Sequence, residues 1–179
     1  MIKTIALVVA GVLVVGIAVV LALAATKPDT FSVQRTASIK APPEKIYPLI
    51  ADLRRFATWS PYETKDPAMK RFYGATTSGK GASYEWNGNK NVGKSRIAIA
   101  DTAPPSKVTI NLDMIDPFEA HNIVEFKLEP KGESTNVTWA MQGKVPYMAK
   151  FVHVIFNMDK MVGGDFETGL GNLKAIAEK

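Results

Sequence analysis

The stretch FSVQRTASIKAPPEKIYPLIADL, residues 31–53, changes from one repeating pattern to another. Over residues 31–39 apolar and polar side chains alternate, which is typical of a half-buried β-strand. Two prolines follow, at a position where proline commonly begins a helix. Over residues 44–53 the apolar side chains recur at helical spacing. The stretch therefore predicts a strand followed by a helix, and it places Arg35 on the apolar side of the strand, where its charge needs a partner.

The chain then returns to alternation. A second helical turn is predicted over residues 54–56, and residues 59–62 are predicted to form a loop. Six further segments have the strand period or turn residues at their ends, namely 70–73, 82–86, 94–100, 107–114, 124–129 and 137–142. Such alternation is typical of an antiparallel sheet with one face in water.

The last part of the chain is predicted to be a long helix. From residue 148 to residue 176 the apolar side chains follow one helical face, and Gly163-Gly164 is expected to divide or bend this helix. The resulting order is β-αα-β6-α, an α+β domain over residues 31–179. In a small domain this order allows a curved antiparallel sheet to surround the C-terminal helix with a space between them.

The N-terminal segment differs from the rest. Residues 4–26 contain no charged residue and no proline. As a helix they would extend roughly 35 Å at about 1.5 Å per residue, enough to cross a hydrocarbon core of about 30 Å. We therefore expect residues 1–27 to be a single-pass transmembrane anchor. Charges flank it on both sides, so its orientation stays open.

A cleaved signal peptide is the alternative for this segment. Ala22-Leu23-Ala24 offers a small-residue cleavage site behind a basic N-terminus. The apolar run is longer than the roughly 7 to 15 residues usual in a signal peptide, which favours an uncleaved anchor.

Several classes of chemistry are not expected. The absence of cysteine excludes disulfides, thiolate metal sites and a cysteine nucleophile. The two histidines, His121 and His153, lack neighbouring ligands, so no metal is predicted. No nucleophile elbow, phosphate loop or dinucleotide fingerprint occurs, so no catalytic residue and no cofactor is assigned. The net charge of +5 lacks a dense basic stripe, and nucleic acid is not expected as a partner.

Particular segments resemble a known group of proteins. They are residues 33–39, 41–47, 59–62, 72–74, 84–89 and 164–167. Together they resemble the SRPBCC, or START-like helix-grip, superfamily, and within it the bacterial polyketide cyclase/dehydrase and lipid-transport branch, many of whose members carry an N-terminal hydrophobic segment. The resemblance covers nearly all of residues 31–179 and implies a helix-grip fold. The resemblance does not single out one function, because the superfamily includes lipid carriers, sterol binders, cyclases and chaperone activators.

Bulky aromatic, aliphatic and methionine side chains are the candidates for lining a cavity between the sheet and the last helix. The side chains are those of Trp59, Tyr62, Phe72, Tyr84, Trp86, Met114, Phe118, Trp139, Met141, Phe151, Ile155, Met158 and Phe166. Aromatic rings with a polar atom and adaptable methionines suit a lipid-like ligand. The alternative is an ordinary filled core; the cavity itself is implied by the resemblance.

These observations favour a binding or transport module for a hydrophobic, lipid-like small molecule, anchored in the bacterial cytoplasmic membrane on a side that the sequence leaves open. The oligomeric state is also open. The alternative is a polyketide cyclase or dehydratase that uses the same cavity, with His153, Tyr84 or Asp165 as acid or base.

Overall fold

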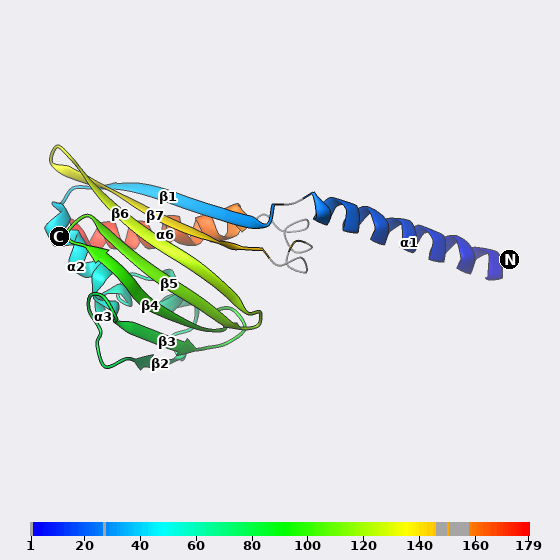
Figure 1. Cartoon of the computed structure of the whole chain (residues 1–179), viewed down its shortest axis with the longest axis horizontal. Coiled ribbons are helices and arrows are strands. Elements are labelled where there is room, and N and C mark those ends of the chain that lie inside the picture. The colour runs from blue at the N-terminus through cyan, green and yellow to red at the C-terminus, as the bar shows by residue number, and fades with distance from the viewer. Residues whose placement is uncertain (1, 27, 146–149, 151–157) are drawn as a thin grey trace.

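The computed structural model describes residues 2–26, 28–145, 150 and 158–179. These residues form one seven-stranded antiparallel sheet in the order β1-β7-β6-β5-β4-β3-β2 (Figure 1). The strands are β1 (Thr30–Ile39), β2 (Lys70–Tyr73), β3 (Ser83–Asn87), β4 (Lys94–Ala103), β5 (Lys107–Asp116), β6 (Ala120–Lys131) and β7 (Ser134–Lys144). All seven predicted strands are confirmed, and the sequence pattern placed most of their ends within four residues.

Helices account for the remaining elements. They are α1 (Ile2–Ala25), α2 (Pro43–Ala51), α3 (Leu53–Phe56), α4 (Pro61–Lys65) and α6 (Met158–Ala177). The predicted α+β class and helix-grip order are confirmed. The predicted loop over residues 59–62 is wrong at its end, because Pro61 takes the first position of α4, where proline's fixed φ suits a helix.

The C-terminal helix packs on one face of the sheet, mainly along β1. We call this side the inner face; it carries Val137, Trp139 and Met141 of β7, which are buried in alternation with more exposed neighbours. Buried side chains of α2, α3 and α6 complete the core, among them Ile46, Ile50, Leu53, Phe166, Leu170 and Leu173. The helix thus covers the apolar side of the sheet and leaves the polar side in water.

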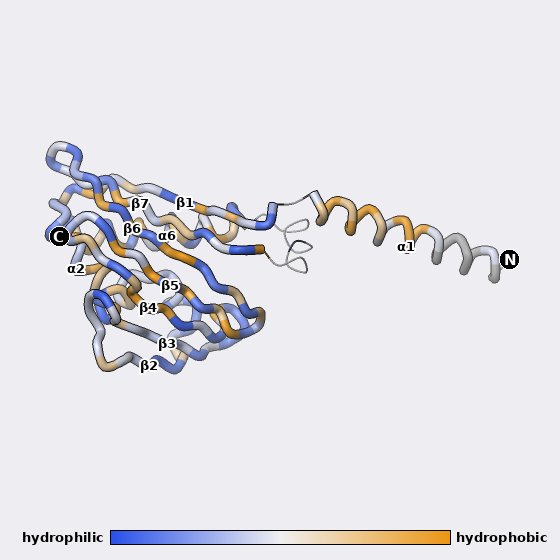
Figure 2. The backbone as a smooth tube through the Cα atoms, viewed as in Figure 1, coloured by the Kyte–Doolittle hydropathy of each residue, from blue (hydrophilic) through white to orange (hydrophobic). Residues whose placement is uncertain are grey.

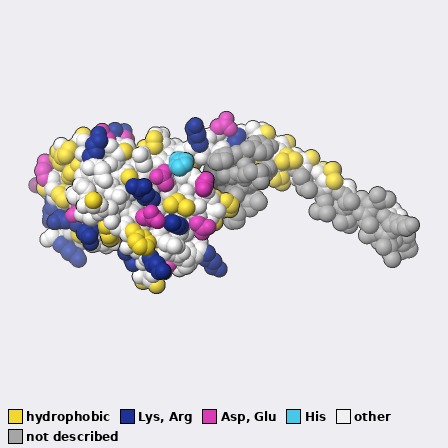
Figure 3. All heavy atoms as spheres, turned by 60° about the horizontal axis from the view of Figure 1, so that its bottom comes forward, with side chains coloured by type: hydrophobic (Ala, Val, Ile, Leu, Met, Phe, Trp, Pro, Cys, Tyr) yellow, Lys and Arg dark blue, Asp and Glu magenta, His cyan; other side chains and the backbone are white. Residues whose placement is uncertain are grey.

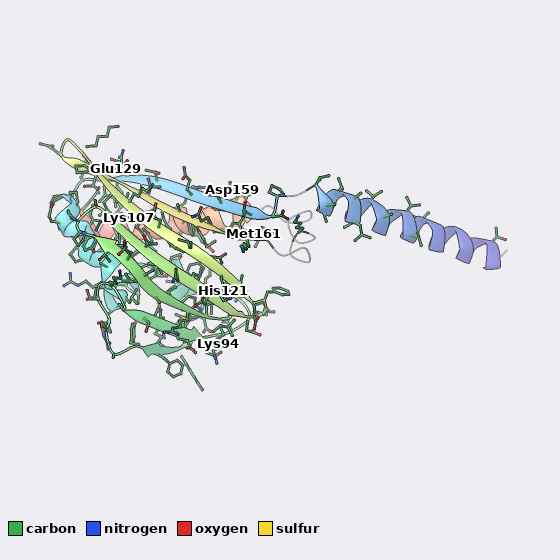
Figure 4. The ribbon with its side chains drawn as sticks, viewed as in Figure 1. Lys94, Lys107, His121, Glu129, Asp159 and Met161 are labelled. Atoms are coloured by element: carbon green, nitrogen blue, oxygen red, sulfur yellow. The ribbon has the colours of Figure 1, made fainter. Side chains whose placement is uncertain are left out.

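Arg35 connects the sheet to α6. It lies on the inner phase of β1, and its Nε donates to Glu167 Oε1 at 2.6 Å while Nη1 donates to Asp159 Oδ1 at 3.0 Å. Figure 4 labels Asp159 near the start of α6, beside β1. A side chain on Gly163 would collide with the Arg35 guanidinium. Glycine at position 163 therefore lets Arg35 approach the helix backbone closely. Because α6 is continuous from Met158 to Ala177, the predicted division of the helix at Gly163-Gly164 is wrong.

The N-terminal segment is helical, as predicted, from Ile2 to Ala25. Figure 1 shows α1 extending away from the sheet, and Figure 2 shows that its described part is largely hydrophobic. Several of its valines and leucines are exposed, including Val12, Val14 and Leu23. Within the described ranges, no helix has the length and hydrophobicity needed to cross a bilayer. The helix is confirmed, and the predicted membrane span is not shown.

Candidate functional site

One part of the inner face is a closed aromatic cluster, which we call the packed end. It consists of Phe56, Trp59, Phe126, Trp139 and Phe166, all buried. The rings of Trp139 and Phe166 stack with centroids 4.2 Å apart, and Phe126 lies 5.0 Å from Trp139. Rings at these separations fill the space between β6, β7 and α6.

The other part lies toward the N-terminal end of β1, and we call it the polar end. The strand register aligns one row of inner-face residues across all seven strands: Phe31, Gly143, Asn122, Leu112, Ile97, Tyr84 and Tyr73. The next row outward contains Met114, Ser95, Trp86 and Arg71. Several polar side chains of the inner face therefore gather at this end.

Exposure separates the two ends. At the polar end, inner-face side chains remain half-buried on four different strands, namely Phe31, Tyr73, Trp86, Leu112 and Met114. At the packed end the corresponding side chains are buried. Solvent therefore reaches the inner face at the polar end, although these side chains point toward the interior of the fold.

Glu63 is the centre of a hydrogen-bonded group at the edge of the polar end. Tyr84 Oη donates to Glu63 Oε1 at 2.7 Å, and Arg71 Nε donates to Glu63 Oε2 at 2.7 Å. The Glu63 side chain is only 14% exposed. Tyr73 stacks on Tyr84, with centroids 4.8 Å apart. This group fixes α4 against the β2–β3 edge of the sheet.

Burial is the main cause that raises the pKa of Tyr84 well above its ordinary range, and the hydrogen bond to Glu63 raises the pKa further. The Glu63 carboxylate likewise raises the pKa of Arg71. Tyr84 therefore stays protonated, with its proton directed to Glu63. A proton transfer by Tyr84 would first have to break this bond.

The other acid-base candidates are placed differently. Asp165 of α6 accepts two hydrogen bonds from Lys65 Nζ of α4, at 2.6 and 2.7 Å. Burial and then the charge of Asp165 raise the pKa of Tyr62 above its ordinary range. His153 lies outside the described residues. Among the residues that are described, no three histidine or carboxylate side chains are grouped as a metal site.

The predicted lining residues are distributed over the whole domain. Trp59, Trp139 and Phe166 belong to the packed end, Met141 lies between the two ends, and Tyr84, Trp86 and Met114 belong to the polar end. Tyr62 is half-buried on α4, close to Lys65. Phe151 and Ile155 lie outside the described residues, as does the side chain of Met158.

Two predicted lining residues do not join the inner face. Phe72 is 55% exposed because it lies on the outward phase of β2, between Arg71 and Tyr73. Phe118 is 71% exposed in the turn between β5 and β6. The structure places both in solvent.

The sequence analysis missed Glu63, Arg71 and Asn122. Asn122 shares the alternating phase of Val124 and Phe126, so extending that strand by two residues would have placed it on the inner face. Glu63 gave no signal, because no helix or strand was predicted between the loop at residues 59–62 and the strand that begins at residue 70.

The chain belongs to the family described as "Polyketide cyclase / dehydrase and lipid transport", which it matches over residues 30–178. The predicted superfamily is thereby confirmed. No curated protein matches the chain. The family comprises ligand-binding folds, so an interior side of the sheet that solvent can reach is the natural candidate site.

Solved structures support the fold at low sequence identity. Protein CV1439 from Chromobacterium violaceum is 16% identical with a TM-score of 0.59, and the match covers 86% of this chain and 99% of that one. Major latex-like protein 151 from Panax ginseng is 16% identical with a TM-score of 0.59, covering 84% and 99%. The Aha1 dimer from Colwellia psychrerythraea is 17% identical with a TM-score of 0.57, covering 83% and 96%.

Proposed function

We propose that this protein binds a hydrophobic, lipid-like small molecule on the inner face of the sheet, at the polar end. The single observation that carries the proposal is the half-buried state of inward-pointing apolar side chains on four strands, Trp86 and Met114 among them. Large apolar side chains that face the interior of a fold yet remain reachable by solvent are typical of ligand sites. Family membership supports the same reading.

The side chains favour binding over catalysis. Tyr84 donates its proton to Glu63, whose other oxygen accepts from Arg71. Asp165 is paired with Lys65. A cyclase or dehydratase needs an acid or base within hydrogen-bond reach of its substrate. The two candidates that the structure describes, Tyr84 and Asp165, are paired with other side chains of the protein instead.

Trp86 provides the test. It is the tryptophan at the polar end, whereas Trp59 and Trp139 are buried at the packed end. The purified full-length protein is extracted with organic solvent, and mass spectrometry identifies any apolar molecule that co-purifies. Adding that molecule back should change tryptophan fluorescence in the wild type and much less in Trp86→Phe. Absence of a co-purifying molecule, or an equal change in both proteins, would contradict the proposal.

We also propose that α1 anchors the domain in the bacterial cytoplasmic membrane. The uncharged run over residues 4–26 and the exposed valines and leucines of α1 support this. Thr30 pairs with Lys144 next to the row that contains Asn122, so the polar end lies at the end of the sheet nearest α1 (Figure 1). An anchored domain would thus hold its ligand site close to the lipid from which an apolar ligand comes.

Membrane fractionation tests the anchor. The full chain should stay in the membrane pellet after alkaline carbonate extraction, and a chain beginning at Lys27 should be soluble. A reporter fused after Lys179 would identify the side on which the domain lies. Release of the full chain by carbonate would contradict the anchor and would leave the binding proposal intact.

A further inference from the structure

Asn122 carries an unsatisfied polar atom in the interior of the fold. The residue is 4% exposed, and among the residues that the structure describes its Oδ1 has no hydrogen-bond partner. Its Nδ2 donates to Met114 Sδ, at 3.7 Å, and a thioether sulfur is a weak acceptor. Buried carboxamides in folded proteins are nearly always hydrogen-bonded, because an unpaired polar atom in the interior costs free energy. The site therefore lacks a partner for this side chain.

Gly143 provides the room that this side chain occupies. It lies opposite Asn122 in the β6–β7 register, and a side chain there would collide with Asn122 Oδ1. The φ of Gly143 is not among the positive values in the chain, so the backbone does not require glycine at this position. The glycine is explained by the space that the Asn122 carboxamide needs.

The surroundings of Asn122 differ from those of the other unsatisfied polar atom in the described part of the chain, Trp139 Nε1. Trp139 is enclosed by the rings of the packed end. Asn122 instead has Leu112 opposite it on β5 and Met114 beside it, and both are half-buried. A ligand on the inner face could therefore reach the carboxamide of Asn122.

We propose that Asn122 recognises a hydroxyl group on the bound apolar molecule, an inference that rests on the proposed function and specifies its ligand class. A hydroxyl donates to Oδ1 and can also accept from Nδ2, so it satisfies both ends of the carboxamide. The neighbours Phe31, Leu112 and Met114 are apolar and suit the hydrocarbon body. The ligand class is a long-chain or polycyclic alcohol.

A charged headgroup fits this position poorly. The charged side chains described at or beside the polar end are already paired: Glu63 with Arg71 at the β2–β3 edge, and Lys150 with Asp29 just before β1. Arg71 is on β2 and is separated from Asn122 on β6 by strands β3, β4 and β5. A carboxylate or phosphate beside Asn122 would have to compete with Glu63 or Asp29 for a counter-charge, and a buried charge without a partner is costly. This distinguishes an alcohol from a fatty acid or a phospholipid.

A matched pair of probes tests the inference. The full-length protein in maltoside micelles is titrated with 1-hexadecanol and with 1-methoxyhexadecane, and binding is followed by tryptophan fluorescence. The ether has no donor for Oδ1, so the wild type should bind the alcohol about tenfold more tightly. Asn122→Leu should bind both probes with nearly equal affinity. Asn111→Leu, the same change on the outer face of β5, should keep the wild-type preference.

Thermal unfolding without ligand supplies a second readout. Because Oδ1 has no partner among the described residues, Asn122→Leu should unfold at a temperature no lower than the wild type. Gly143→Ala should reduce the preference for the alcohol, since the methyl group displaces the carboxamide.

The contrary outcomes are distinct. Equal affinity of the wild type for both probes, or a preference that survives in Asn122→Leu, overturns the inference and leaves the binding function intact. A marked loss of thermal stability in Asn122→Leu shows a structural role and also overturns it. Binding of neither probe to any of these proteins overturns the inference together with the proposed function.

Discussion

The packed end and the polar end share strands β6 and β7 and the same face of the sheet, yet they differ in polarity and in exposure. At the packed end Trp139, Phe126 and Phe166 are buried against one another. Four residues away along β6 and β7, the inner face carries Asn122 and Gly143, and the neighbouring Met114 is half-buried. One sheet thus contains a complete core and an incomplete one.

The difference indicates a division of roles along the sheet. Close-packed rings stabilise the fold, whereas apolar side chains that stay half-buried contribute less to stability. The surface charges do not show this division. On the face in Figure 3, lysine and arginine side chains are interspersed with acidic ones, and Figure 4 places Lys94, Lys107 and His121 on different strands. The asymmetry belongs to the inner face.

The largest expected effect comes from breaking the packed end. Phe126→Ala removes a fully buried ring that contacts Phe56, Trp59 and Trp139, and it should lower the free energy of unfolding by about 3 to 5 kcal/mol. Urea denaturation measures the change. Trp86→Ala, at the polar end, should cost clearly less because its side chain is already half-exposed. Equal losses would show that the two ends do not differ in packing.

A smaller effect is expected at the edge of the polar end. Tyr84→Phe removes the hydrogen bond to Glu63 and should cost about 1 to 2 kcal/mol, because Glu63 keeps its bond to Arg71. Tyr47→Phe on α2 is the control.

The pH dependence of this effect follows from the raised pKa of Tyr84. Its contribution to stability should be fully present below the ordinary tyrosine pKa of 10.0 and should decline as the pH rises above it. The gap between wild type and Tyr84→Phe should therefore narrow above pH 10. A gap that widens there would contradict the assignment of the proton to Tyr84.

The Arg35 contact with α6 should have a weaker effect that appears mainly as acid sensitivity. Arg35 lowers the pKa of Asp159 below its ordinary value of 3.8, so this contribution is present above pH 3.8 and is lost as the pH falls through the lowered pKa. Arg35→Gln should therefore be less stable than wild type at pH 7, and the difference should shrink below pH 3.8. Urea denaturation across this range tests it, and Asp101→Asn at an exposed ion pair is the control.

The smallest effect is expected for Phe118. Its ring is mostly in solvent between β5 and β6, so Phe118→Ser should change the free energy of unfolding by less than about 0.5 kcal/mol. It should also leave ligand binding at the polar end unchanged. Loss of binding in the fluorescence assay would show that the β5–β6 turn belongs to the ligand site.

Sequence periodicity predicted most of the fold, because the burial of one face of each strand or helix sets the spacing of its apolar residues. Val108, Ile110 and Leu112 alternate with polar residues, and the strand that they form is β5. The alternation also placed Arg35 on the inner phase, where α6 supplies its partners. Periodicity failed at Pro61, where the local signal for a loop was overridden by a short helix packed against the core.

The site was less predictable because a strand pattern shows the phase of a residue and not its depth. Trp139 and Trp86 have the same inward phase, but Trp139 is enclosed by rings that include Phe56 of α3 and Phe166 of α6, whereas Trp86 is half-buried. Phe72 and Phe118 were selected for ring size alone. The pairing of Glu63 with Tyr84 joins residues 21 positions apart and depends on how α4 meets the sheet.

The antiparallel register of β1 also has a mechanical consequence. β1 pairs with β7 along its whole length, from Thr30 opposite Lys144 to Ile39 opposite Thr135, and α1 precedes it in the chain (Figure 1). A pull on α1 is therefore directed along the strand, and the ladder hydrogen bonds, which run across the strands, share the load in shear. Arg35 passes part of that load to α6. The strand that connects the domain to its N-terminal helix is thus well suited to resist being pulled lengthwise out of the sheet.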